Sequence, residues 1–171
     1  MRTAMQSIDK QLWWSIILPS TRLRLYNTCI LPIFLYGSER WAITKEDARR
    51  INALRQWCLC MLLGINWYHF ISNDEVRRHT NQPLVTEIIQ AQRLTLFGHI
   101  TQMDDNLDAK QILTSSPAVY RKKPPGRQRM TGMKTVQNDL NSLGLSWTDA
   151  VDLTQNRPLW RLLATSGATH S

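Results

Sequence analysis

The sequence contains no long hydrophobic run. Its longest apolar stretch covers eight residues, from Cys29 to Tyr36, and it includes Pro32. A helix that crosses a membrane needs about 20 apolar residues, so the sequence predicts no transmembrane segment and no membrane partner. Residues 1–10 also lack the apolar core and the cleavage site of a secretory signal. We therefore expect an intracellular protein, in the nucleus or the cytoplasm, that is not secreted.

Cysteine is scarce. The three cysteines, Cys29, Cys58 and Cys60, are an odd number, and no Asn-x-Ser/Thr glycosylation site accompanies them. A secreted disulfide scaffold is therefore excluded, and we expect reduced thiols. Cys58 and Cys60 could be combined with His69 and His79 as a zinc set, but helical residues two apart point about 200° away from each other and cannot meet at one ion. No metal site is predicted.

Motifs for independent catalysis are also absent. The chain has no G-x-S-x-G elbow and no phosphate-binding G-x-x-x-x-G-K-Ser/Thr loop. Asp104 and Asp105 are adjacent acids, but polymerase chemistry needs two divalent ions about 4 Å apart, held by acids from separate strands. We interpret this pair as an acidic turn that ends a helix, and His99, after Gly98, as a packing residue. No catalytic residue, cofactor or small-molecule substrate is predicted.

Positive charge is in excess. The chain carries 21 Lys and Arg against 13 Asp and Glu, which gives a formal net charge of +8 and a pI near 9.9. Residues 1–40 hold five cations and two acids, and residues 41–115 hold eight of each. Residues 116–134 hold six cations and no acid. This local excess predicts a polyanionic partner.

Residues 116–134, the basic segment, contain Pro124, Pro125 and Gly126 in a row. This run cannot continue a helix or enter a central strand, so we expect a loop or linker. Its cations would neutralise phosphates and release counterions, and a solvated linker without a partner is the alternative. The predicted nucleic-acid-binding residues are Arg121, Lys122, Lys123, Arg127 and Arg129 in this segment, and Arg77, Arg78 and Arg93 outside it.

Helix start and stop signals recur along the chain, and no segment alternates with period two. A first helix is expected over residues 5–18, and a second that Pro32 should kink or stop. Thr44-Lys-Glu-Asp47 predicts the start of a helix with one apolar stripe that should end at Gly64. Further helices are expected after Ser72, over residues 85–103 and 133–143, after Ser146, and after Asn156 with Pro158 in the first turn.

The length of 171 residues allows one domain or two small ones. The fold class is mostly α. The expected organisation is a helical lead-in over residues 1–44, a main helical bundle over 45–115, the basic linker over 116–134 and a small C-terminal helical segment over 135–171. Most of the seven tryptophans should be core residues. Trp67 and Tyr68 are the expected exceptions, as surfaces on which bases could stack.

A set of short motifs in a fixed order resembles one protein family. The motifs are Leu25-Tyr-Asn-Thr-Cys-Ile-Leu-Pro-Ile-Phe-Leu-Tyr-Gly-Ser-Glu39, Trp57-Cys-Leu, Asn73-Asp-Glu-Val-Arg77, Arg93-Leu-Thr-Leu-Phe-Gly-His-Ile100, Pro124-Pro-Gly-Arg127 and Asn156-Arg-Pro-Leu-Trp-Arg161. Together they resemble the C-terminal segment, thumb and post-thumb, of a non-LTR (LINE-type) retrotransposon reverse transcriptase polyprotein. The resemblance covers nearly the whole chain.

The resemblance implies a thumb-like helical bundle followed by a small helical appendage. In this family the polymerase aspartates and their Mg²⁺ belong to a palm domain upstream of the matched segment, and the intact parent is an RNA-directed DNA polymerase. The implied partners are an RNA template, a DNA primer duplex and that upstream palm domain. The implied role is to grip template or primer phosphates without catalysis by this chain.

A different function is predicted by the apolar run. Residues Ile30 to Leu35 could form an exposed surface that packs against another protein. The alternative is therefore a helical protein-interaction or oligomerisation module, or a non-functional relic of a retroelement.

Overall fold

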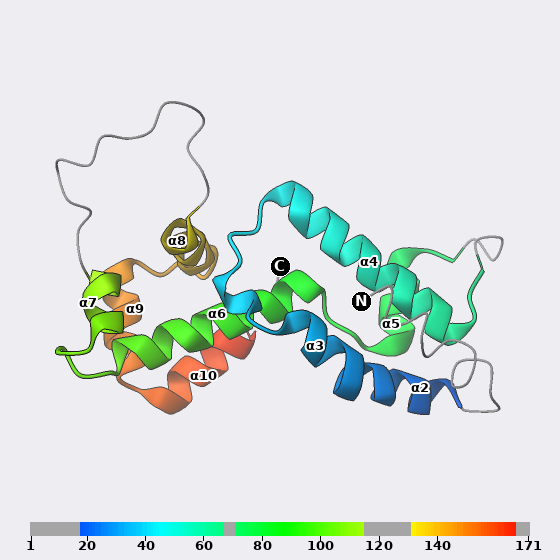
Figure 1. Ribbon diagram of the computed structural model, residues 1–171, viewed down its shortest axis with the longest axis horizontal. Coiled ribbons are helices and arrows are strands. Elements are labelled where there is room, and N and C mark those ends of the chain that lie inside the picture. Colours follow the sequence, from blue (N-terminus) through cyan, green and yellow to red (C-terminus); the bar gives the residue numbers. More distant parts are fainter. Residues whose placement is uncertain (1–17, 67–70, 115–130, 167–171) are drawn as a thin grey trace. The chain divides into compact units, whose positions relative to one another are not determined.

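The computed structural model describes residues 18–66, 71–114 and 131–166. Within these ranges the chain is mostly helical and contains no strand (Figure 1). None of the described helices has the length and hydropathy that a membrane span requires. The expected first helix and the aromatic residues Trp67 and Tyr68 lie outside the described residues. The elements are α2 (Pro19–Leu25), η2 (Tyr26–Ile30), α3 (Leu31–Leu35), η3 (Ser38–Arg40), α4 (Lys45–Leu63), α5 (Asn73–Thr80), α6 (Val85–Thr101), α7 (Asp108–Thr114), α8 (Gly132–Ser142), α9 (Trp147–Thr154) and α10 (Arg157–Ser166).

Pro32 does not stop the second expected helix. The chain stays helical from Pro19 to Leu35, and the turn before the proline, η2, is a π-helix in which the Leu31 amide donates to the Tyr26 carbonyl. The wider π turn accommodates the residue whose ring and missing N–H disturb an α-helix. Of the two predicted outcomes, a kink or a stop, the stop does not occur, and the helix widens locally before the proline.

Helix α4 follows the predicted pattern at its surface and at its end. Arg49, Arg50 and Ala53 are exposed, as expected for the polar side. Gly64 adopts a φ of +69°, and the Ile65 amide donates to the Cys60 carbonyl at 2.9 Å, which closes the helix as a Schellman motif. The buried residues of α4 are Arg55, Cys58, Leu59 and Leu62.

The chain divides into two compact units. Among the described residues, the first unit comprises 18–38 and 45–86, and the second comprises 39–44 and 87–166. This division differs from the expected boundary near residue 115, because the helices on both sides of the basic segment share one core. That core is made of Leu94, Phe97, Leu140, Ala150, Trp160 and Ala164.

The first unit is built on contacts of α4 with α2 and α5. Tyr26, Cys58 and Val76 are almost completely buried in it. Two polar contacts connect α4 to the chain that follows α5. Arg55 donates from Nη2 to Gln82 Oε1 at 2.8 Å, and Asn52 donates from Nδ2 to Thr86 Oγ1 at 3.2 Å. The motif residues around Tyr26 and Cys58 are therefore core residues of this unit.

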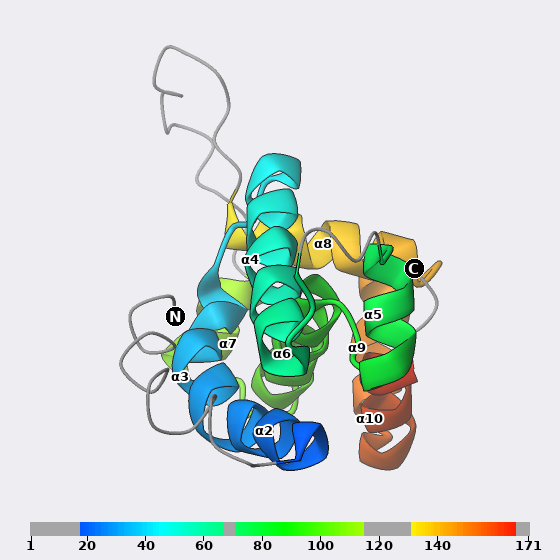
Figure 2. The ribbon, with the colours of Figure 1, turned by 90° about the vertical axis from the view of Figure 1, so that its right-hand side faces the viewer.

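Trp160 fixes the last helix of the second unit. Its indole Nε1 donates to the Leu94 carbonyl of α6 at 3.0 Å, and the indole lies against Gly98, where an added Cβ would overlap the ring. Phe97 packs on the same indole, with the ring centroids 5.7 Å apart. Figure 2 shows α9 leading into α10, with α8 above them. Two motifs of the resemblance, 93–100 and 156–161, thus meet in one core.

Two predicted helix starts are confirmed by their capping hydrogen bonds, and a third by the position of its proline. The Ser72 hydroxyl accepts from the Glu75 amide at 3.2 Å, and the Ser146 hydroxyl accepts from the Asp149 amide at 3.2 Å. Pro158 lies in the first turn of α10, as predicted. Helix α7 was not predicted, because its seven residues are too few to show a clear apolar stripe.

Candidate nucleic-acid interface

The basic segment lies mostly outside the described residues. Arg121, Lys122, Lys123, Arg127 and Arg129 all fall within 115–130, so their placement stays a prediction. The structure does describe the two ends. On one side, Leu113 of α7 packs against the core of the second unit, and on the other side Val136 of α8 packs against the same core. Both ends of the basic segment are therefore anchored in one unit.

Lys134 is the basic residue of this segment that the structure describes. It lies in the first turn of α8 and its side chain is exposed. Its backbone amide donates to Thr131 Oγ1 at 3.3 Å, which caps the helix. The first turn of α8 contains no acid that would pair with the ammonium group. Lys134 therefore presents its charge to solvent where the basic segment joins α8.

Arg77 and Arg78 lie in the last turn of α5, and only one of them is fully available. The Arg77 guanidinium pairs with Asp74, one turn earlier, and is about one-third exposed. Arg78 is exposed and forms no ion pair within the part of the chain that the structure describes. Helix α5 ends at Thr80, and the next residue, Asn81, caps it in the left-handed conformation with a φ of +49°.

The predicted phosphate contact of Arg93 does not fit its surroundings. Only 7% of its side chain is exposed, and its Nε lies 2.6 Å from Asp139 Oδ2. Its Nη1 also donates to the Trp41 carbonyl at 3.0 Å. The guanidinium thus makes its contacts inside the second unit, where it connects α6 to α8 and to residues 39–44, and it is not available to a phosphate.

Burial also affects the pKa of Asp139, the ion-pair partner of Arg93. Desolvation raises the pKa of the Asp139 carboxyl above its ordinary value, while the hydrogen bond and the positive charge of Arg93 act in the opposite direction. The pair is therefore a structural ion pair that carries a desolvation cost and contributes no charge to the surface.

The acidic turn after α6 is a helix end, as predicted. Helix α6 stops at Thr101, and Asp105 pairs with Lys110 of α7 at 2.6 Å. The same ammonium donates to the Met103 carbonyl at 2.9 Å. The hydrogen bond and charge of Lys110 lower the pKa of the Asp105 carboxyl. Within the described ranges, no group of three or more His, Cys, Asp or Glu residues could hold a metal ion.

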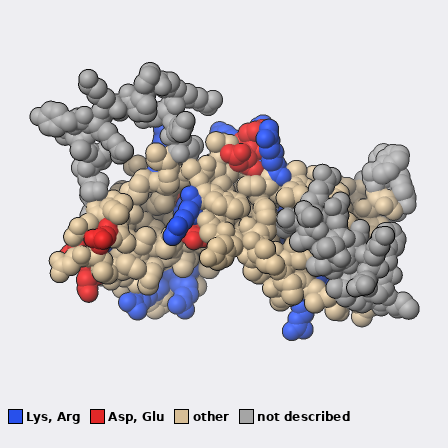
Figure 3. Space-filling view, viewed as in Figure 1, with Lys and Arg blue, Asp and Glu red and all other residues tan. Residues whose placement is uncertain are grey.

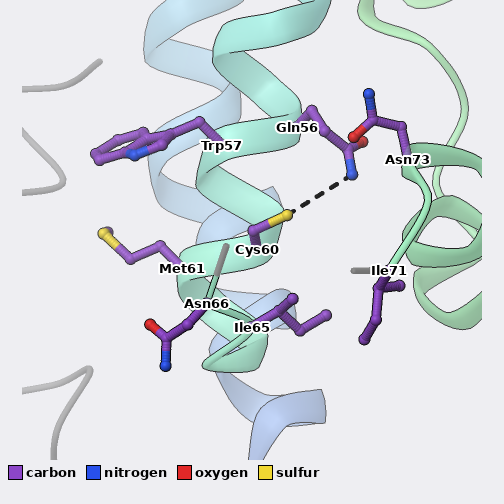
Figure 4. Close-up of a pocket in the computed structure, with 8 residues that line it drawn as sticks. All are labelled: Gln56, Trp57, Cys60, Met61, Ile65, Asn66, Ile71 and Asn73. Carbon is purple, nitrogen blue, oxygen red and sulfur yellow. Dashed lines mark hydrogen bonds between the residues drawn. The ribbon is translucent and has the colours of Figure 1, made fainter. Parts of the chain in front are cut away.

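A pocket of about 530 Å³ lies between the second half of α4 and the start of α5 (Figure 4). None of the described residues that line it is charged. In Figure 4 the Gln56 carboxamide points toward Asn73 and also donates to the Cys60 thiol, at 3.7 Å. Such a lining suits an uncharged group, because the described residues offer no cation to a phosphate. The lining residues are Gln56, Trp57, Cys60, Met61, Ile65, Asn66, Ile71 and Asn73.

A second pocket, of about 500 Å³, follows one side of α6 in the second unit. It is lined by Ile88, Leu96 and His99, among others, and by Glu39. His99 is exposed there, so its interpretation as a packing residue was wrong. The reason is that Phe97 and Gly98 face the core, and the next position on the helix faces away from it.

Arg157 and Arg161 are among the exposed cations that were not predicted as site residues. Both are on α10, four residues apart, and both are exposed. The signal that could have found them is the absence of any acid in residues 157–166. It was hidden by the net charge of −1 over residues 135–171, to which Asp139, Asp149 and Asp152 contribute.

Comparison of the chain with protein-family models, with curated proteins and with solved structures finds no match.

Proposed function

We propose that this chain is a nucleic-acid-binding segment that grips phosphates and performs no catalysis of its own. The single observation that carries the proposal is the anchoring of the basic segment. Residues 116–134 hold six cations and no acid, and the helices before and after them pack through Leu113 and Val136 on one core. The cations are thus tied at both ends to a folded unit.

This anchoring favours binding for a physical reason. Bringing the two ends of the segment together costs conformational entropy, and this loss occurs when the unit folds. The binding step therefore does not include it. The cations that would contact phosphates are Arg121, Lys122, Lys123, Arg127 and Arg129, with Lys134 beside them. Each phosphate that they neutralise releases counterions and makes binding depend on salt.

The resemblance to the thumb and post-thumb segment of a non-LTR retrotransposon reverse transcriptase gives the proposal its ligand. The partners would be an RNA template and a DNA primer duplex, and the palm domain upstream would supply the polymerase chemistry. Arg78, exposed in the last turn of α5, is a further candidate contact in the first unit, and Arg77 beside it is partly occupied by Asp74.

The test is binding across a salt series. A labelled RNA hairpin and a matched RNA/DNA duplex would be titrated with the chain and with a variant in which the five residues Arg121, Lys122, Lys123, Arg127 and Arg129 are Gln. We expect a steep fall of log K with log salt for the chain, and a slope that is smaller by about 0.7 to 0.9 for each lost contact in the variant. Absence of binding at low salt would contradict the proposal.

A second candidate function is supported by an exposed apolar surface on α3. Ile33 of α3 is 74% exposed, and Tyr36, which follows the helix, is 87% exposed. Of the other large residues of the predicted surface, Ile30, Leu31 and Leu35 are buried, so the exposed part is smaller than the apolar run suggested. Large apolar side chains in this state favour contact with another protein surface. Size-exclusion chromatography with light scattering decides this point: self-association that Ile33→Ser with Tyr36→Ser abolishes would support it, and a clean monomer would count against oligomerisation.

A further inference from the structure

Helix α10 carries an isolated pair of exposed arginines. Arg157 and Arg161 are four residues apart, so they lie on adjacent turns of the same side of the helix, about 6 Å apart along its axis. Helix α10 contains no acidic residue. In Figure 3 the Lys and Arg atoms over α10 form a blue patch at the lower left, and these two residues are the only Lys or Arg of the helix.

The orientation of this pair is set by the buried side of α10. Trp160 is 4% exposed and Ala164 is 1% exposed, both within the core of the second unit. The hydrogen bond from the indole to the Leu94 carbonyl and the close fit against Gly98 prevent rotation of α10 about its axis. The arginines are therefore presented by a helix with a fixed orientation.

The two guanidinium groups are available for an outside anion. Neither takes part in an ion pair among the residues that the structure describes. This distinguishes them from Arg49 and Arg50, which are also exposed but both contact Glu46, at 3.7 and 3.1 Å. A cation in the first turn of a helix is also disfavoured by the helix dipole, which Arg157 experiences at the start of α10.

We propose that Arg157 and Arg161 form a second phosphate contact on the same nucleic acid that the basic segment binds. The inference rests on the proposed function, because it concerns the same ligand. Helix α10 belongs to the unit in which both ends of the basic segment are anchored. Guanidinium groups bind phosphate oxygens in a bidentate manner, so a pair on adjacent turns is suited to neighbouring phosphates of one strand.

The experiment compares three variants with the unchanged chain, using the labelled RNA hairpin in a salt series. The first is Arg157→Gln with Arg161→Gln. The second is the matched control Arg49→Gln with Arg50→Gln, which removes the same charge from exposed positions of another helix. The third is the variant of the basic segment with its five residues changed to Gln. Circular dichroism and thermal melting verify that each variant is folded.

We expect log K of the α10 variant to fall less steeply with log salt. The magnitude of the slope should decrease by about 1.4 to 1.8, which corresponds to two lost phosphate contacts. The control should change it by much less. An unchanged slope in the α10 variant, together with a smaller slope in the variant of the basic segment, would overturn this inference and leave the proposed function intact. No binding by the unchanged chain would overturn both.

A competitor separates nucleic acid from an acidic protein as the partner. Polyglutamate of the same charge as the hairpin would be added to the preformed complex. We expect it to compete poorly, because carboxylates on a flexible chain do not reproduce the spacing of phosphates on a strand. Competition by polyglutamate as strong as by unlabelled RNA, and lost in the α10 variant, would overturn the assignment of phosphates as the ligand.

Discussion

Gly98 holds the position at which the indole of Trp160 reaches α6. Replacing a helical glycine by alanine normally stabilises a helix by about 1 kcal/mol. Here the added methyl group would overlap the indole, and overpacking of this kind costs about 1 to 3 kcal/mol, with a further loss if the hydrogen bond to the Leu94 carbonyl breaks. We expect Gly98→Ala to lower the free energy of unfolding, measured by urea titration.

The control for this change is Thr95→Ala, one turn earlier on an exposed position of α6. The Thr95 hydroxyl donates only to the Ala91 carbonyl of its own helix, so this substitution should be near neutral. A Gly98→Ala variant that is more stable than the unchanged chain would show that the indole does not occupy the space beside Gly98.

Cys58 gives the first unit a dependence on alkaline pH. Burial raises the pKa of its thiol from 9.0 to about 11, against the smaller effect of Arg55 nearby. Burial also raises the pKa of the neighbouring Tyr26 phenol. The folded state therefore binds protons that the unfolded state has released, and stability that is complete below pH 9 is lost as the pH rises toward 11.

We expect the free energy of unfolding to fall by about 1 to 2 kcal/mol between pH 8.5 and pH 10. Urea titrations at the two pH values measure the fall. The variant Cys58→Ala should be less stable at pH 8.5, because it leaves a cavity, and should lose less stability on the way to pH 10. An equal fall in the variant would show that this thiol is not the titrating group.

At the scale of elements, the ion pair of Arg93 and Asp139 joins α6 to α8. Both side chains are largely buried, so removal of either partner leaves the other charge desolvated and unpaired. We expect Arg93→Met and Asp139→Leu each to cost roughly 3 kcal/mol, and the double variant to cost much less than their sum. A double-variant cycle by chemical denaturation measures this. Strictly additive costs would contradict a direct interaction.

Most helix positions could be predicted from local signals, but the connections between helices could not. Capping serines such as Ser72 and Ser146 act on amides three residues away, so their effect can be read from neighbouring residues. The contact of Trp160 with Leu94 spans 66 positions in the sequence. No local pattern carries that pairing, which is why residues 135–171 were predicted as a separate appendage.

The candidate site also has a part that could be predicted from the sequence and a part that could not. The basic segment is evident from composition, whereas the burial of Arg93 depends on Asp139, which is 46 residues away. A count of charges cannot distinguish an arginine used inside the fold from one at the surface. The exposed pair on α10 was missed because acids on the neighbouring helices α8 and α9 made the net charge of residues 135–171 negative.

At the scale of the whole molecule, the reactivity of the cysteines measures how well the first unit is folded. Cys29, Cys58 and Cys60 all belong to the first unit, and they are exposed, buried and half-buried respectively. With a thiol reagent at pH 8, we expect Cys29 to react first, Cys60 more slowly, and Cys58 only when the first unit opens. Mass spectrometry of peptides over time measures the order. Early modification of Cys58 would contradict its burial in the core of the first unit.

The shared core around Trp160 should hold the second unit together even if the chain is cleaved within residues 115–130. Helices α6 and α7 precede residues 115–130, and α8, α9 and α10 follow them, yet side chains from both groups fill one interior. A protein cut at a single peptide bond in that interval would keep its two pieces together without a covalent link. The two halves, produced as separate polypeptides, should reassemble when mixed and elute as one species.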